Sequence, residues 1–217
     1  ADSAYTLLKE IPNPQQYPEK ERARWCLLMT QAIDKTYRTH TSDSLIRFAV
    51  NYYEKVNDLS KLPTAFYTLG RVQRDLKDNE HAVNSFLKAL DLSKGSDDYK
   101  LQYLAASQLG HVYAYSRFID EALKTYQQAL YFAEQDNDSI SLSYANSYLG
   151  RVYGLQKDWN RSIEFYQKAI SIAQQTSYIP VLRLGLNELA AIYKCCEKYQ
   201  EAADCLEQLI SLEDDPL

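Results

Sequence analysis

Hydrophobic residues recur along most of the chain at spacings of three and four residues, which is the period of an amphipathic helix. Two such stretches, Tyr103–Ser116 and Asp120–Glu134, follow each other with only a short break between them. The six Gly and six Pro residues of the whole chain are too few for a protein built of strands and hairpins. The pattern therefore predicts an all-α protein made of antiparallel helix pairs.

The sequence also matches itself at an offset of forty residues. Leu69, Leu109 and Leu149 each begin a Leu-Gly-x-Val block, and Leu189 begins a variant that has Ala190 in place of Gly. The second helix of each pair carries small, aromatic and aliphatic residues in the same register: Ala82, Phe86 and Ala89, then Ala122, Tyr126 and Ala129, then Ser162, Tyr166 and Ala169, then Ala202, Leu206 and Leu209. The repeat predicts four units over residues 63–102, 103–142, 143–182 and 183–217, preceded by degenerate helical repeats over residues 1–62.

Three glycines of the repeat, Gly70, Gly110 and Gly150, fall inside predicted helices. Glycine inside a helix costs about 1 kcal/mol relative to alanine. This cost is tolerated most readily where a neighbouring helix approaches closely. We therefore predict close contacts at these positions, with the aromatic residue of the second helix filling the space.

The repeated residues resemble the tetratricopeptide repeat family, whose spacing is reproduced by Leu109, Gly110, Tyr113, Ala122, Tyr126 and Ala129. The resemblance implies a right-handed α-solenoid with a concave groove lined mainly by the first helix of each pair. The chain departs from the family in its period of 40 residues, against about 34, and in lacking the proline after the second helix. We expect the extra residues to lengthen helices, as the apolar rhythm of Ser139–Tyr148 indicates, whereas Pro180 either starts or breaks a helix.

The first third of the chain is out of register with the repeat. Helices are predicted over Asp2–Glu10 and Glu19–Tyr37, and a third helix, capped by Ser42 or Asp43, runs through Asn57. This part resembles the N-terminal region of tetratricopeptide proteins common in Bacteroidetes, which are typically exported lipoproteins or sensor-like membrane proteins. The resemblance implies a lipoprotein signal removed before the first residue and a periplasmic or lipid-anchored location, with a cytoplasmic location as the alternative.

Composition and charge exclude several classes. The net charge is −5 and no basic block occurs, so nucleic acid is a poor candidate partner. No stretch approaches the ~18 consecutive apolar residues of a membrane helix. The four cysteines form no C-x-x-C pair and the three histidines are scattered, so neither a metal site nor a cofactor is expected.

Catalytic motifs are missing from the sequence. It contains no H-E-x-x-H, no G-x-S-x-G, no Walker loop and no G-x-G-x-x-G. We therefore predict no catalytic residues, and an enzyme is only a weak alternative.

Function is then expected at the groove of the implied solenoid. Arg71, His111 and Arg151 occupy one equivalent position in three successive units, which predicts a ladder of basic side chains, with Arg74 and Lys194 near its ends. The full set of predicted groove residues is Tyr67, Arg71, Arg74, Ser107, His111, Tyr115, Tyr144, Ser147, Arg151, Asn187 and Lys194. Such a ladder favours an anionic ligand, such as an acidic peptide or a C-terminal carboxylate. The alternatives are solvated basic residues or residues that pair with acids of the same array.

The sequence thus predicts a non-enzymatic scaffold that binds a protein or peptide in its groove. The alternative is the sensory ectodomain of a membrane-anchored regulator. The last predicted helix, Tyr199–Leu212, carries an apolar face with Ala202, Leu206, Leu209 and Ile210. No further helix follows in this sequence to cover this face, so we expect either that the sequence is a piece of a longer chain or that the face mediates self-association.

Overall fold

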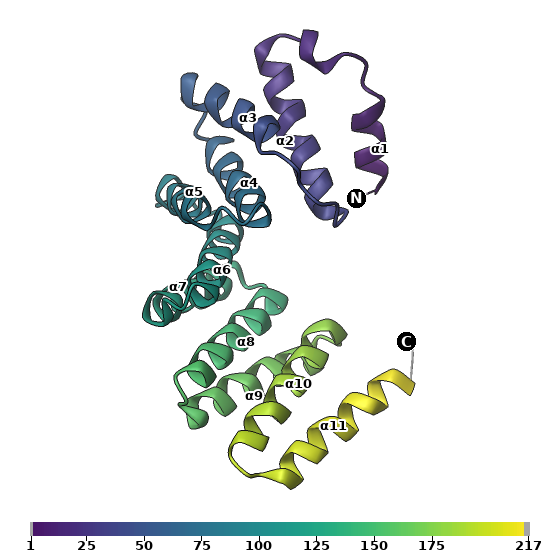
Figure 1. Ribbon diagram of the computed structural model, residues 1–217, viewed down its shortest axis with the longest axis vertical. Coiled ribbons are helices and arrows are strands. Elements are labelled where there is room, and N and C mark those ends of the chain that lie inside the picture. The colour runs from purple at the N-terminus through teal and green to yellow at the C-terminus, as the bar shows by residue number, and fades with distance from the viewer. Residues whose placement is uncertain (1, 215–217) are drawn as a thin grey trace. The chain divides into compact units, whose positions relative to one another are not determined.

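The computed structural model describes residues 2–214, and over these residues every regular element is a helix (Figure 1). The elements are α1 (Asp2–Glu10), a 3₁₀ turn (Pro14–Gln16), α2 (Glu19–Lys35), α3 (Ser44–Lys55), α4 (Leu62–Asp75), α5 (Asn79–Leu92), α6 (Tyr99–Tyr115), α7 (Ile119–Asp136), α8 (Ser139–Leu155), α9 (Trp159–Gln175), α10 (Ile179–Cys195) and α11 (Tyr199–Asp214). The predicted all-α class is confirmed. The outer limits of the first and last predicted units, residues 1 and 215–217, lie outside the described residues.

The chain divides into two compact units, residues 1–112 and 113–217. In the first unit α2 packs on α3 and α4 packs on α5, and Ile46 and Ala65 are fully buried in its core. In the second unit α8 packs on α9 and α10 on α11, with Val181 and Ala173 fully buried. Each unit therefore has a hydrophobic core of its own.

The turns within helix pairs do not use glycine, which is one reason that the chain contains so few glycines. At intervals of forty residues, a residue just after the end of each first helix adopts a positive φ. These residues are Lys77 (64°), Arg117 (67°), Lys157 (61°) and Glu197 (59°). A left-handed residue ends a helix by turning the backbone out of it, a position that glycine usually takes. Here residues with side chains take it, so the helix ends carry no glycine signal in the sequence.

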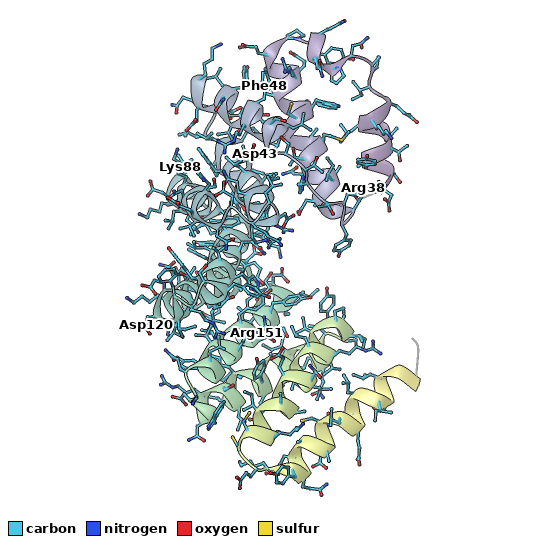
Figure 2. All side chains as sticks on the ribbon, in the orientation of Figure 1. Arg38, Asp43, Phe48, Lys88, Asp120 and Arg151 are labelled. Carbon is cyan, nitrogen blue, oxygen red and sulfur yellow. The ribbon has the colours of Figure 1, made fainter. Side chains whose placement is uncertain are left out.

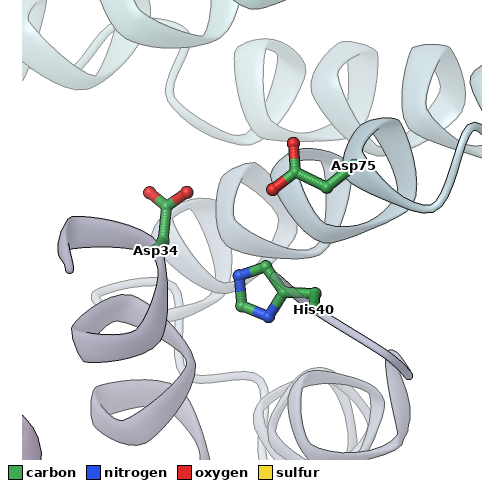
Figure 3. Close-up of side chains that lie close together, drawn as sticks. All are labelled: Asp34, His40 and Asp75. Atoms are coloured by element: carbon green, nitrogen blue, oxygen red, sulfur yellow. The ribbon is translucent and has the colours of Figure 1, made fainter. Parts of the chain in front are cut away.

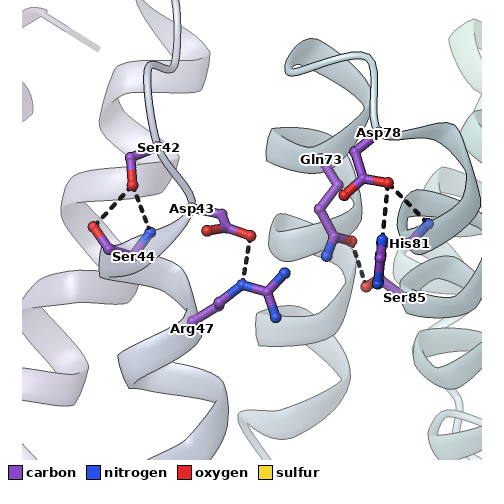
Figure 4. A network of polar contacts seen from close by, with 8 residues as sticks. All are labelled: Ser42, Asp43, Ser44, Arg47, Gln73, Asp78, His81 and Ser85. Atoms are coloured by element: carbon purple, nitrogen blue, oxygen red, sulfur yellow. Dashed lines mark hydrogen bonds and ion pairs between the residues drawn. The ribbon is translucent and has the colours of Figure 1, made fainter.

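Aspartates begin several of the second helices. The Asp78 side chain accepts a hydrogen bond from the backbone N–H of His81 at the start of α5 (Figure 4), and Asp158 accepts one from the N–H of Arg161 at the start of α9. These bonds satisfy backbone donors that no helical carbonyl reaches. The same device starts both α5 and α9, one in each unit.

Two of the glycines predicted to lie at close helix contacts, Gly70 and Gly150, do so. A Cβ atom on Gly70 would stand 2.7 Å from the ring of Phe86, and one on Gly150 would stand 2.9 Å from the ring of Tyr166. Phe86 and Tyr166 are 0% and 1% exposed, so neither ring has room to move away. The aromatic residue of the second helix thus occupies the space that the missing side chain leaves.

The prediction that the extra residues lengthen helices is also confirmed. α7 has 18 residues and α8 has 17, and only Asn137 and Asp138 separate them. Pro180 lies in the first turn of α10 and therefore starts that helix instead of breaking it. Among the described helices, none combines the length and the apolar character that crossing a membrane requires.

Long side chains connect the N-terminal helices α1, α2 and α3 through a hydrogen bond and two cation–π contacts. The Trp25 indole donates a hydrogen bond of 3.0 Å to the carbonyl oxygen of Leu8. Arg38 lies 4.2 Å from the ring centre of Tyr5, and Arg22 lies 4.0 Å from that of Phe48; Figure 2 labels Arg38 and Phe48. These contacts tie α1 and α3 to α2 and to the segment that follows it.

Two predicted boundaries of this region shift. α2 ends at Lys35, two residues before the predicted end at Tyr37, and α3, which begins at Ser44, ends at Lys55, two residues before the predicted end at Asn57. The Ser42 hydroxyl accepts the backbone N–H of Ser44, whereas the Asp43 carboxylate pairs with Arg47 at 2.5 Å (Figure 4). Of the two predicted caps, Asp43 occupies the N-cap position without a side-chain cap hydrogen bond, and Ser42, one residue earlier, accepts the backbone N–H.

Candidate functional site

The first candidate cluster lies in unit 1 around Arg71, on α4. Its Nη2 atom is 2.6 Å from Oδ1 of Asp34, on α2, and its Nη1 donates to the Tyr67 hydroxyl at 3.4 Å. The side chains of Arg71 and Asp34 are 22% and 19% exposed. Burial raises the pKa of Tyr67, so its hydroxyl stays neutral. The predicted basic residue is therefore a half-buried ion pair.

Arg74, one turn further along α4, is also engaged. Its Nη2 lies 2.7 Å from Oδ1 of Asp75, and its Nη1 donates to the Gln108 side chain. Each of the two predicted basic residues on this helix thus forms an ion pair with one aspartate. The positive charge that the sequence places on α4 is balanced within unit 1.

His40 completes this cluster and was not predicted from the sequence. It is 6% exposed, and its Nε2 atom is buried without a hydrogen-bond partner. Burial lowers the pKa of His40 below its usual value, so the imidazole is neutral at pH 7. Figure 3 shows it beside Asp34 and Asp75, and one ligand atom from each of the three residues lies within 4.8 Å of the others. The sequence predicted no metal site, yet it is here that metal-ligating groups converge.

The second candidate cluster lies in unit 2 around Arg151, on α8 and labelled in Figure 2. Its Nη2 lies 3.3 Å from Oε1 of Glu188, on α10, and Tyr166 donates from its hydroxyl to Oε2 of the same carboxylate at 3.3 Å. Arg151 and Glu188 are 31% and 32% exposed. Burial, and next to it the charge of Glu188, raises the pKa of Tyr166, which keeps this donor protonated.

A stack of tyrosines continues along α8 from this pair. The ring of Tyr148 stacks on Tyr126 with centroids 5.2 Å apart and on Tyr144 with centroids 6.0 Å apart. Tyr178 meets Tyr144 edge-on at 6.1 Å. Tyr126 is 1% exposed, whereas the other three are partly exposed. Tyr144 was predicted, but Tyr148 was missed, although it stands one turn from Tyr144 on the same helix.

The structure corrects the expected orientation of Ser107 and Ser147. They are 2% and 3% exposed, and their hydroxyl oxygens are buried without a hydrogen-bond partner. On α8, Ser143, Ser147 and Gly150 form a buried stripe of small residues along the face that meets neighbouring helices. Small residues at this spacing let helices approach, and the burial of Ser147 supports a packing role for it.

The other predicted residues remain on the surface to different degrees. Tyr115 is 80% exposed, Asn187 and Lys194 are exposed, and His111 is partly buried. The three positions of the predicted ladder are distributed over both units, with Arg71 and His111 in the first and Arg151 in the second. The ladder itself, and ligand binding by any of these residues, stays a prediction.

Comparison with protein-family models finds tetratricopeptide repeats in three stretches. Residues 63–95, 102–175 and 186–217 each match a model described as a tetratricopeptide repeat. Together these stretches cover more than half of the chain. A search of the curated proteins finds no significant match.

Solved structures share the fold at low sequence identity. BtubC (BKLC) from P. vanneervenii is 17% identical with a TM-score of 0.81, over 98% of this chain and 89% of the other. The apo form of RapI is 15% identical with a TM-score of 0.82, over 98% and 59%. A Rap protein complexed with competence and sporulation factor is 16% identical with a TM-score of 0.69, over 95% and 58%. These similarities establish the helical solenoid class of the fold.

Proposed function

We propose that this chain, a tetratricopeptide repeat protein, is a non-enzymatic scaffold that binds a segment of another protein along the first helices of its repeats. The supporting observation is that α4 and α8 each present an arginine, half-buried in an ion pair, beside tyrosine. Arginine and tyrosine are the residues that most often dominate binding energy at protein interfaces. Among proteins of similar fold, a Rap protein is complexed with competence and sporulation factor, which supports a peptide ligand.

An acidic ligand would bind by exchange. Asp34 and Glu188 already occupy Arg71 and Arg151, so an incoming carboxylate replaces an internal one. Such a replacement keeps the arginine paired and releases the internal acid to solvent. The net gain in binding free energy is therefore smaller than for a carboxylate that binds an unpaired arginine. The groove therefore selects ligands that combine a carboxylate with apolar side chains that pack on the tyrosines.

This function can be tested with a peptide library. Every sequence in the library occurs twice, once with a free and once with an amidated C-terminus. The test variant carries Arg71→Ala and Arg151→Ala. The control variant carries Arg47→Ala and Arg161→Ala, which removes one arginine per unit from exposed pairs with Asp43 and Asp158 within the same helix turn.

We expect the test variant to lose about ten- to a hundred-fold in affinity for the selected peptides, while the control binds as the parent does. Circular dichroism establishes that both variants are folded. Selected peptides that bind parent, test and control variants equally would place binding elsewhere on the protein.

Self-association through α11 is a second part of the proposal. Leu206 and Ile210 on this helix are 42% and 59% exposed, while Ala202 and Cys205 on its other side are buried. A second copy covering the exposed side would remove these apolar side chains from water. Light scattering of the parent should then give a mass above 25.1 kDa, and Ile210→Glu should return it to the monomer mass. A parent that stays monomeric at high concentration contradicts self-association.

Export and lipid anchoring rest on the N-terminal resemblance, as does the alternative of a sensory ectodomain. The complete gene tests both, since a lipobox cysteine would indicate anchoring and a transmembrane helix before a regulatory domain would indicate a sensor. Fractionation of the native cells then locates the protein.

A further inference from the structure

Three metal-ligating side chains converge in unit 1 from separate parts of the chain. Asp34 comes from the last turn of α2, His40 from the segment between α2 and α3, and Asp75 from the end of α4 (Figure 3). One ligand atom from each lies within 4.8 Å of the other two. Figure 3 shows the imidazole of His40 lying close to the carboxylate of Asp34, with a ring nitrogen on the side that faces it.

His40 is the observation that separates this cluster from an ordinary group of surface acids. Its side chain is more than nine-tenths buried, and Nε2 has no hydrogen-bond partner. A buried polar atom is nearly always paired, so an unpaired one needs an explanation such as an ion bound at that position. The unprotonated nitrogen of a neutral imidazole has a lone pair that it can donate, and it is a common metal ligand.

The two carboxylates each keep one oxygen available. Asp34 uses Oδ1 to pair with Arg71, and Asp75 uses Oδ1 to pair with Arg74. Within residues 2–214 no hydrogen bond engages the second oxygen, Oδ2, of either residue. A carboxylate that ligates a metal is itself often held by a hydrogen bond, and the arginines are placed to orient both ligands in this way.

The charge balance limits how tightly a cation is held. Asp34 and Asp75 are balanced by Arg71 and Arg74, so these four charged side chains have no net charge before a metal enters. The cation is attracted by two carboxylates and repelled by two guanidinium groups. Binding therefore depends on direct coordination bonds, which transition metals form with imidazole and which Mg²⁺ and Ca²⁺ do not favour.

We propose that Asp34, His40 and Asp75 bind a divalent transition metal of the zinc or cobalt type, with water in the remaining coordination position. Ligand atoms around one tetrahedral zinc ion lie roughly 3.3 Å apart, given metal–ligand bonds of about 2.0–2.1 Å. The three ligand atoms therefore have to approach one another by up to about 1.5 Å when the metal binds. The metal ties α2 to α4 across the segment that carries His40, and it shares Asp34 with the ion pair of Arg71.

The experiment uses the full chain with Cys195→Ser and Cys196→Ser, which removes the thiols that are not buried. After chelator treatment, Zn²⁺ alone is added while long-range ¹H–¹⁵N spectra follow the imidazole rings. The chain has only three histidines, so the spectrum is simple and His→Gln variants assign it. His81 is the internal control, because it also pairs with an aspartate, Asp78, at 2.9 Å but has no third ligand.

We expect one equivalent of zinc to shift the ¹⁵N resonance of Nε2 of His40 and to leave His81 unchanged. Asp75→Asn, whose side chain is partly exposed, should fold normally and lower zinc affinity at least tenfold. Zinc should also raise the melting temperature of the parent and not that of His40→Gln. An unmoved His40 resonance in excess zinc overturns the proposal, and so does unchanged affinity in Asp75→Asn.

Discussion

The two units place an arginine at the same repeat position and neutralise it in opposite ways. Arg71 pairs with Asp34, which precedes it by 37 residues, and Arg151 pairs with Glu188, which follows it by 37 residues. The acid therefore comes from an earlier helix, α2, in one unit and from a later helix, α10, in the other. An equivalent position in a repeat fixes where a charge stands, and the neighbouring helices decide whether that charge is available.

The surroundings of the two arginines also differ. Around Arg71 lie polar groups, with His40, Arg74 and Asp75 close by. Beside Arg151 on α8 lies the stack of Tyr126, Tyr148 and Tyr144. The side chains around Arg71 in unit 1 are thus suited to contacts with ions, whereas those beside Arg151 in unit 2 are suited to packing against flat apolar groups. The same repeat supplies two chemically different surfaces.

The largest expected effect concerns the feature that the units share. Gly70→Leu and Gly150→Leu should each lower the free energy of unfolding by about 3 kcal/mol, because the new side chain meets the buried ring of Phe86 or Tyr166. Urea unfolding followed by circular dichroism measures this.

Gly154→Ala on α8 is the matched control for these variants. A Cβ atom there meets the flexible end of the Ile192 side chain at 3.0 Å and the Ser162 hydroxyl oxygen at 3.3 Å, so the change should cost less than about 1 kcal/mol. Equal stability of Gly150→Leu and the parent would mean that the helix contact at Gly150 is absent in solution.

The next effect separates the two ion pairs. Asp34→Ala should lower the free energy of unfolding by about 2 kcal/mol, because it leaves Arg71 half-buried and unpaired. Glu188→Ala should cost only about 1 kcal/mol, since Arg151 is more exposed and its pair is longer, at 3.3 Å against 2.6 Å. Chemical unfolding at low and high salt checks both, and a larger loss for Glu188→Ala would reverse the comparison.

The smallest single contribution, the stacking of one ring, is tested on the aromatic side of unit 2. Tyr148→Ala removes the middle ring of the stack and should cost about 1 kcal/mol beyond the loss of buried area. Tyr148→Phe keeps the ring and should stay within about 0.5 kcal/mol of the parent. Thermal melts compare the two variants, and equal losses would assign the effect to the hydroxyl group instead of the stacked ring.

The helices and their register could be predicted because the signals for them are local. The apolar period, the buried glycines and the aromatic residues twelve to sixteen positions later all act within one helix pair, and the close contact at Gly150 was predicted from them. Even there a local detail was missed, because Lys77 and Lys157 end helices in a conformation for which lysine gives no sequence signal.

The candidate site could be predicted only in part. Arg71, Arg151 and Tyr144 were identified from their repeat positions, and the structure places them on half-buried faces. Ser107 and Ser147 were assigned to the groove because they stand one turn before the basic position, but they belong to the packing face. Residues one turn apart lie on the same side of a helix, so spacing alone does not separate these serines from the basic positions. The hydropathy of serine does not distinguish a packed from a solvated position either.

The sequence by itself determined that the chain is helical, that its helices pair in a repeat of forty residues, and which helix carries each charged residue. Only the tertiary structure decided that Asp34 reaches Arg71, that Glu188 reaches Arg151, and that His40 is buried beside two aspartates. The physical reason is the range of the interactions. Helix propensity and capping act over a single turn. An ion pair across 37 residues depends on how whole helices pack, and many side chains jointly set that packing.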